Sequence, residues 1–135
     1  MTASKNSTTS KSDKFYEAII SSALMFRTRG TYGSFDKALT SLIKRKPIIE
    51  TGCSKDVCEK HFRSALKVVD DALEFENSYI RKKKAWLYSS GWFDSTTIDE
   101  ISRAMGQYLK KRNPEAPAIF IERCIGRIYY FYHLA

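Results

Sequence analysis

The sequence predicts an all-α protein, a compact bundle of about five helices behind a flexible N-terminal tail. Apolar residues recur along most of the chain at a period of about 3.6, which is the spacing of one helix face. Glycine, proline and N-cap residues separate these periodic segments. The alternation typical of strands is weak everywhere. Residues 47–51, the one short extended candidate, have no obvious pairing strand, so we interpret them as a loop.

The first two helices are expected at residues 13–27 and 34–45, each with an apolar stripe at helical spacing. The glycine-containing stretch 29–33 should separate them, because glycine tolerates the positive φ of helix ends. Ser34 is a good N-cap for the second helix, and Pro47 should end it.

The third helix is expected at residues 55–88, with Ser54 as its N-cap. Its length would be roughly 50 Å at about 1.5 Å per residue, which is long for a domain of this size. We therefore expect a kink or break near residues 77–78, or a projecting end.

The fourth and fifth helices are expected at residues 96–111 and 114–133. Thr97-x-x-Glu100 matches a capping box for the fourth, and Asn113-Pro114 is a good start signal for the fifth. The fifth helix has almost no polar face. Such a helix is either central in a bundle or covered by a partner.

The chain organisation expected is a tail over residues 1–12 and a single helical domain over residues 13–135. The start lacks the apolar segment of a secretory signal, and no run is long enough for a membrane span. Three cysteines, a low and odd number, argue against a disulfide framework. These features favour an intracellular protein of the cytoplasm or nucleus, and no motif indicates a cofactor.

The formal net charge of +8 favours a polyanionic partner, either nucleic acid or an acidic protein surface. Three basic runs are candidate nucleic-acid contacts: Lys44, Arg45 and Lys46; Arg81, Lys82, Lys83 and Lys84; and Lys110, Lys111 and Arg112. The first and third runs also fall at expected helix C-termini, where cations complement the helix dipole. We expect a small non-enzymatic binding module that contacts nucleic acid or a nucleoprotein by neutralising phosphates.

An alternative function follows from the aromatic end of the fifth helix. If Tyr129, Tyr130 and Tyr132 are exposed together, they form an apolar patch of the kind that marks an interface. The chain would then be a protein–protein adaptor or an assembly subunit, with a protein partner or a second copy of itself.

Residues 97–106 are similar to the first helix and turn of a helix-turn-helix, with Ser102 as the small residue and Gly106 at the turn. Gln107 and Pro114 do not suit a following recognition helix. An ordinary helix hairpin is therefore the better interpretation of this segment.

A metal site is a further alternative, because Cys53, Cys58 and His61 place three possible ligands at a helix start. Cys124 or His133 from the fifth helix would complete a tetrahedral zinc set. The spacing is not a standard zinc pairing, and a buried cysteine more often acts as a small apolar residue.

The pattern Arg127-x5-His133 resembles the Arg-x4-6-His motif of the HEPN superfamily of helical ribonucleases. The resemblance implies that Arg127 holds phosphate and that His133 acts in acid–base chemistry on RNA. It covers seven residues, and Ile128 stands where a polar residue usually follows the arginine.

Overall fold

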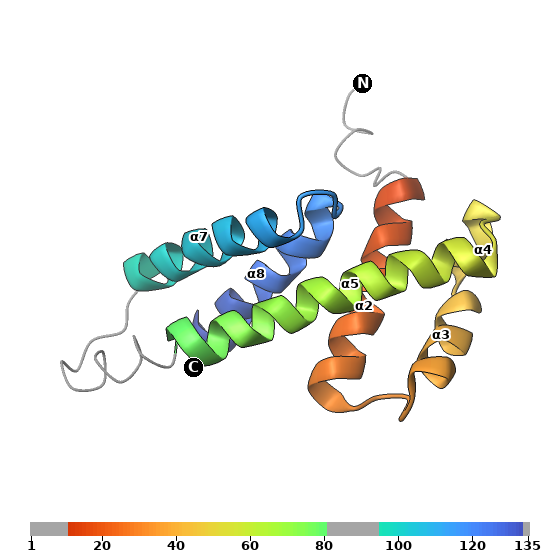
Figure 1. Cartoon of the computed structure of the whole chain (residues 1–135), viewed down its shortest axis with the longest axis horizontal. Coiled ribbons are helices and arrows are strands. Elements are labelled where there is room, and N and C mark those ends of the chain that lie inside the picture. The colour runs from red at the N-terminus through yellow and green to blue at the C-terminus, as the bar shows by residue number, and fades with distance from the viewer. Residues whose placement is uncertain (1–10, 81–94, 134–135) are drawn as a thin grey trace, which may run out of the picture. The chain divides into compact units, whose positions relative to one another are not determined.

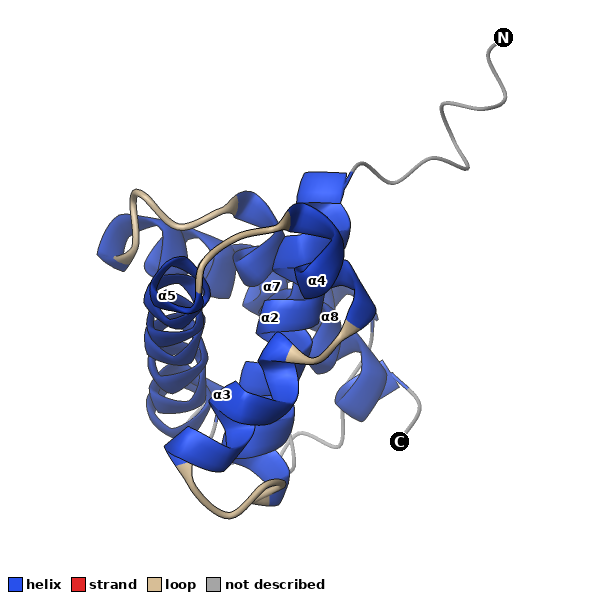
Figure 2. Cartoon of the chain, turned by 90° about the vertical axis from the view of Figure 1, so that its right-hand side faces the viewer, coloured by secondary structure: helices blue, strands red, loops and turns tan. Residues whose placement is uncertain are grey.

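The structure is a computed structural model that describes residues 11–80 and 95–133 (Figure 1). All the secondary structure of these residues is helical, as Figure 2 shows, which confirms the all-α class. The elements are α2 (Lys11–Arg29), α3 (Phe35–Ile43), α4 (Lys46–Thr51), α5 (Lys55–Phe75), the π-helix η1 (Glu76–Ile80), α7 (Ser95–Arg112) and α8 (Ala118–His133). None of these helices is long and apolar enough to cross a membrane.

The chain divides into two compact units, Met1–Leu66 and Lys67–Ala135, and the division falls within α5. Residues 1–10 of the expected tail lie outside the described residues. The last two positions of that tail, Lys11 and Ser12, already belong to α2.

The core of the first unit is built around Phe62 of α5, which is fully buried. Its ring centroid lies 6.4 Å from that of Phe26 on α2 and 5.4 Å from that of Phe35 on α3. Aromatic rings at these separations combine burial of a large apolar area with favourable ring–ring geometry. The apolar stripes of α2 and α3 supply the other buried side chains, among them Ile19, Ile20, Ala23, Ala38, Leu39 and Leu42.

Two predicted N-caps are confirmed. The Oγ of Ser34 accepts a hydrogen bond from the backbone N–H of Lys37, and the Oγ of Ser54 accepts one from Val57, each at 3.2 Å. Between α2 and α3, Gly30 and Gly33 have φ values of 65° and 83°. The expected glycine break is thus also present, because these conformations are open to glycine at little steric cost.

The expected loop at residues 47–51 is wrong, because these residues form most of α4. Pro47 lies in the first turn of α4, where the missing N–H is not needed and the fixed φ suits a helix. The proline therefore starts a new helix directly after α3. Ile48 is buried, and Gly52, with a φ of 68°, ends the helix.

The connection between α3 and α4 is attached to α2 by Arg45. Its Nη1 donates to the backbone oxygen of Ala18 and to the Oγ of Ser22, both at 3.2 Å. Ser22 is fully buried, so this hydrogen bond satisfies a hydroxyl that has no access to water.

The long third helix is regular only as far as Phe75. From Glu76 to Ile80 the hydrogen-bond pattern changes to that of a π-helix, so the chain departs from a regular α-helix in the region where a kink or break was expected. The remainder of the predicted helix, residues 81–88, lies outside the described residues.

In the second unit, α7 and α8 pack side by side as a helix hairpin (Figure 1). The helix-turn-helix alternative is wrong, because α7 continues through Gly106 to Arg112 without a turn. A Cβ on Gly106 would lie only 3.2 Å from the Cδ1 of Ile125. The glycine therefore permits the close approach of α8 and does not form a turn.

The start predicted for the fifth helix at Asn113-Pro114 is also wrong, since α8 begins at Ala118. The backbone N–H of Asn113 donates to the carbonyl of Leu109 at 2.8 Å, so Asn113 closes α7. The side of α7 that faces the core carries Ile98, Ile101, Met105 and Leu109, which are all buried, while Tyr108 is half-buried. Phe120, Cys124 and Ile128 form the buried side of α8, while Glu122 and Arg123 are exposed.

Two buried serines differ in hydrogen bonding and should differ in their effect on stability. The Oγ of Ser102 has no hydrogen-bond partner among the described residues, whereas Ser22 accepts from Arg45. Ser102→Ala should raise the free energy of unfolding by up to about 1 kcal/mol, because it removes an unsatisfied hydroxyl. Ser22→Ala should lower it by about 1 kcal/mol, because it removes an acceptor of Arg45. Urea unfolding followed by circular dichroism measures both, and equal effects would contradict this assignment.

Candidate nucleic-acid interface

The first basic run lies at the junction of α3 and α4. Lys44 is the C-cap of α3, Arg45 is the N-cap of α4, and Lys46 is the first residue of α4. The guanidinium of Arg45 is used by its hydrogen bonds to α2. Lys44 and Lys46 are exposed, and no hydrogen bond or ion pair joins their ammonium groups to another described residue.

The third basic run is the last turn of α7, where Lys110, Lys111 and Arg112 complement the helix dipole. The Nε of Arg112 lies 3.4 Å from the Oδ1 of Asp71, and its guanidinium lies 5.2 Å from the ring centroid of Tyr108. Lys110 and Lys111 are exposed and make no such contact with the described residues. In both described runs, the arginine thus makes contacts with other residues of the fold, whereas the lysines are exposed to solvent.

The second run, Arg81, Lys82, Lys83 and Lys84, lies outside the described residues. The first run belongs to the unit Met1–Leu66 and the third to the unit Lys67–Ala135.

The two units differ in charge. Residues 1–66 contain twelve Lys and Arg against six Asp and Glu, whereas residues 67–135 contain eleven against nine. Six of the eight net positive charges thus belong to the first unit. A local excess of one sign raises the concentration of counter-ions and of polyanions near that surface.

A hollow on α3 adds four residues that the sequence did not indicate as site residues. It is open to solvent, has a volume of about 330 Å³ and is lined by Asp36, Lys37, Thr40, Ser41 and Lys44. Only Lys44 was a predicted site residue. The other four residues lie three and four positions apart, on the side of α3 opposite its apolar stripe. This spacing in the sequence could have indicated that they share one helix face.

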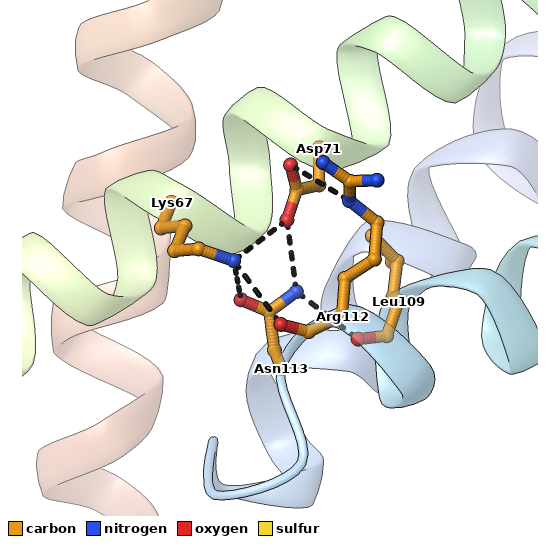
Figure 3. A network of polar contacts seen from close by, with 5 residues as sticks. All are labelled: Lys67, Asp71, Leu109, Arg112 and Asn113. Atoms are coloured by element: carbon orange, nitrogen blue, oxygen red, sulfur yellow. Dashed lines mark hydrogen bonds and ion pairs between the residues drawn. The ribbon is translucent and has the colours of Figure 1, made fainter.

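The buried carboxylate of Asp71 is the centre of a polar network in the second unit (Figure 3). The Nζ of Lys67 donates to Asp71 at 3.1 Å, to the Oδ1 of Asn113 at 2.9 Å and to the carbonyl of Arg112 at 3.2 Å. The Nδ2 of Asn113 donates to Asp71 and to the carbonyl of Leu109, both at 3.0 Å.

The pKa of Asp71 follows from this network. Burial alone would raise the pKa, but the hydrogen bonds from Asn113 and Lys67 and the charges of Lys67 and Arg112 lower it on balance. Asp71 is therefore ionised at neutral pH. The network holds the C-terminus of α7 against α5, which is a structural role.

The metal hypothesis for Cys53, Cys58 and His61 is not supported. Among the described residues, no three His, Cys, Asp or Glu lie close enough together to hold a metal ion. The His61 ring instead makes edge contacts with Phe15 and Tyr16 of α2, at centroid distances of 5.6 and 5.3 Å. Burial raises the pKa of the Cys58 thiol to about 11, as expected of a small apolar core residue.

Arg127, the phosphate-holding residue implied by the HEPN resemblance, donates to the Oε2 of Glu76 in η1. Burial raises the pKa of Glu76, and the charge and hydrogen bond of Arg127 partly offset this rise. Positions 127 and 133 both belong to α8 and, at about 100° per residue, differ by about 240° around a regular helix. This spacing does not place the two positions on one helix face.

The side chain of His133 lies outside the described residues, as do those of Tyr129, Tyr130 and Tyr132. The acid–base role of His133 and the aromatic interface therefore stay predictions.

Comparisons of the chain with models of protein families, with curated proteins and with solved structures found no match.

Asp71 should be required for stability. Asp71→Asn removes the charge that Lys67 and Arg112 share, and it should lower the free energy of unfolding by about 1–3 kcal/mol at neutral pH. Because the folded pKa of Asp71 is lowered, its contribution should be present at neutral pH and lost as pH falls through that pKa. Urea unfolding at several acidic pH values measures this loss. Glu74→Gln, an exposed substitution on the same helix, is the control; an equal effect of both variants would refute the role of Asp71.

His61 should make the stability of the protein depend on pH in a higher range. Burial, followed by the charge of Lys60, lowers the pKa of His61, so the unfolded chain takes up a proton at a higher pH than the folded chain. The free energy of unfolding should therefore fall as pH is lowered below about 6.5. Denaturant unfolding at pH values on either side measures the fall, which should be smaller in His61→Gln. An unchanged pH dependence in that variant would contradict the assignment to His61.

Proposed function

We propose that this chain is a small, non-enzymatic binding module that contacts nucleic acid through sequence-independent neutralisation of phosphates. The observation that carries the proposal is the availability of the lysines. Lys44, Lys46, Lys110 and Lys111 are exposed, and their ammonium groups have no partner among the described residues. By contrast, Arg45 donates to the carbonyl of Ala18, and Arg112 forms an ion pair with Asp71.

The mechanism is electrostatic. A lysine that approaches a nucleic acid displaces condensed counter-ions from the phosphates, and the entropy of their release favours the complex. The positive charge of residues 1–66 supports this mechanism, because it raises the rate of encounter with a polyanion at low salt. Arg81, Lys82, Lys83 and Lys84 belong to the proposal on the strength of the sequence.

The proposal predicts a steep dependence of binding on salt. Affinity for a fluorescent 20-base-pair duplex of mixed sequence should fall by orders of magnitude between about 50 and about 200 mM salt, as for proteins that make several phosphate contacts. Lys44→Gln/Lys46→Gln and Lys110→Gln/Lys111→Gln should each weaken binding, since neither pair makes a side-chain contact that the fold requires. Each lysine that touches phosphate should contribute about 0.9 to the logarithmic salt slope.

Fluorescence anisotropy across the salt series is the measurement, with circular dichroism as the check that each variant folds. Binding that does not change with salt would refute phosphate neutralisation. Absence of binding at about 50 mM salt would refute the nucleic-acid function, and a protein partner would then be the function to test.

A further inference from the structure

The hollow on the outer side of α3 brings together chemical groups that bind phosphate. Two ammonium groups, from Lys37 and Lys44, and two hydroxyls, from Thr40 and Ser41, line it. Lysine, serine and threonine side chains are common donors to the phosphate oxygens of nucleic acids. The opposite side of α3 faces the core and carries the buried residues Ala38, Leu39 and Leu42.

The donors of the hollow are available for a ligand. Lys37 and Lys44 are exposed, and no ion pair joins either ammonium group to another described residue. Their backbone N–H groups donate at the two ends of α3, that of Lys37 to the Oγ of Ser34 and that of Lys44 to the carbonyls of Ser41 and Leu42. Binding an anion would therefore not require breaking a contact of the fold.

We propose that this hollow is the subsite in which α3 holds two phosphates of one nucleic-acid strand, an inference that rests on the function proposed above. Positions 37 and 44 are seven residues apart, which is about 10.5 Å along a helix axis. That separation suits two different phosphates of a strand better than a single phosphate ion. Thr40 and Ser41, which lie between the two lysines, supply uncharged donors to the same backbone.

Asp36 gives the proposal a second and opposite test. Its carboxylate also lines the hollow, where it repels phosphate, and it lies in the first turn of α3, where it complements the helix dipole. Removing this charge should therefore strengthen binding of the strand while slightly weakening the helix.

The experiment compares variants of equal charge in the full chain. Lys37→Gln/Lys44→Gln should weaken binding to the 20-base-pair duplex about tenfold or more at low salt and lower the salt slope by about 1.8, as expected for two phosphate contacts. The control, Lys55→Gln/Lys60→Gln, removes the same charge from exposed positions of α5 in the same unit and should have a smaller effect. A nucleoside monophosphate should compete only weakly, because it carries a single phosphate group.

The second test substitutes Asp36→Asn, which should tighten binding to the duplex. Its control, Asp56→Asn, removes an acidic residue from the first turn of α5 outside the hollow. Both substitutions remove a carboxylate that favours a helix dipole, so a difference between them reports on the hollow itself.

The outcomes separate the two proposals. If the unmodified protein does not bind the duplex, the proposed function fails and this inference fails with it. If the unmodified protein binds and the Lys37/Lys44 and Lys55/Lys60 variants are equally weakened, only the subsite is overturned. Efficient competition by the monophosphate would overturn the strand in favour of a single phosphate ligand. A larger loss in the Lys37/Lys44 variant, together with tighter binding by Asp36→Asn, supports the subsite.

Discussion

The buried carboxylate of Asp71 imposes the constraint on which the packing of the C-terminus of α7 against α5 depends. An ionised group removed from water must be compensated by charge and hydrogen bonds. Lys67 supplies the charge, and Asn113 supplies a hydrogen bond while its amide also bonds the carbonyl of Leu109 (Figure 3). Asn113 thus connects Asp71 to the end of α7, and four further residues follow before α8 begins at Ala118.

Arginine and lysine have different roles in the two described basic runs, and their chemistry explains the difference. A guanidinium presents several donors in a fixed plane, so Arg45 can bond a carbonyl and a hydroxyl of α2 at once. Arg112 combines a carboxylate with an aromatic face in the same way. An ammonium group on a flexible stem is strongly hydrated and gains less from such sites. In each run the arginine therefore stabilises the fold, and the neighbouring lysines supply the surface charge.

Much of the fold could be predicted from local patterns, and the errors occurred where one local pattern fits two structures. The apolar period placed α2, α3 and α7 to within two residues of their observed ends. A proline suits the first turn of a new helix as well as the end of the previous one, so Pro47 was misinterpreted. The role of Asn113 depends on Asp71, which lies 42 positions away in the sequence. No local pattern contains that contact, just as none shows that α2 uses Arg45.

The composition of the α3 hollow determines what kind of recognition it can provide. Arginine, asparagine and glutamine side chains can make paired hydrogen bonds to the edges of particular bases, and such pairs give strong discrimination between bases. The hollow contains none of these three residues, and Arg45, which follows Lys44, is used by α2. Lysine ammonium groups and hydroxyls are common donors to phosphates, which are the same at every position of a strand. Under the proposed function, binding at this surface should therefore depend on the density of phosphate more than on the order of bases.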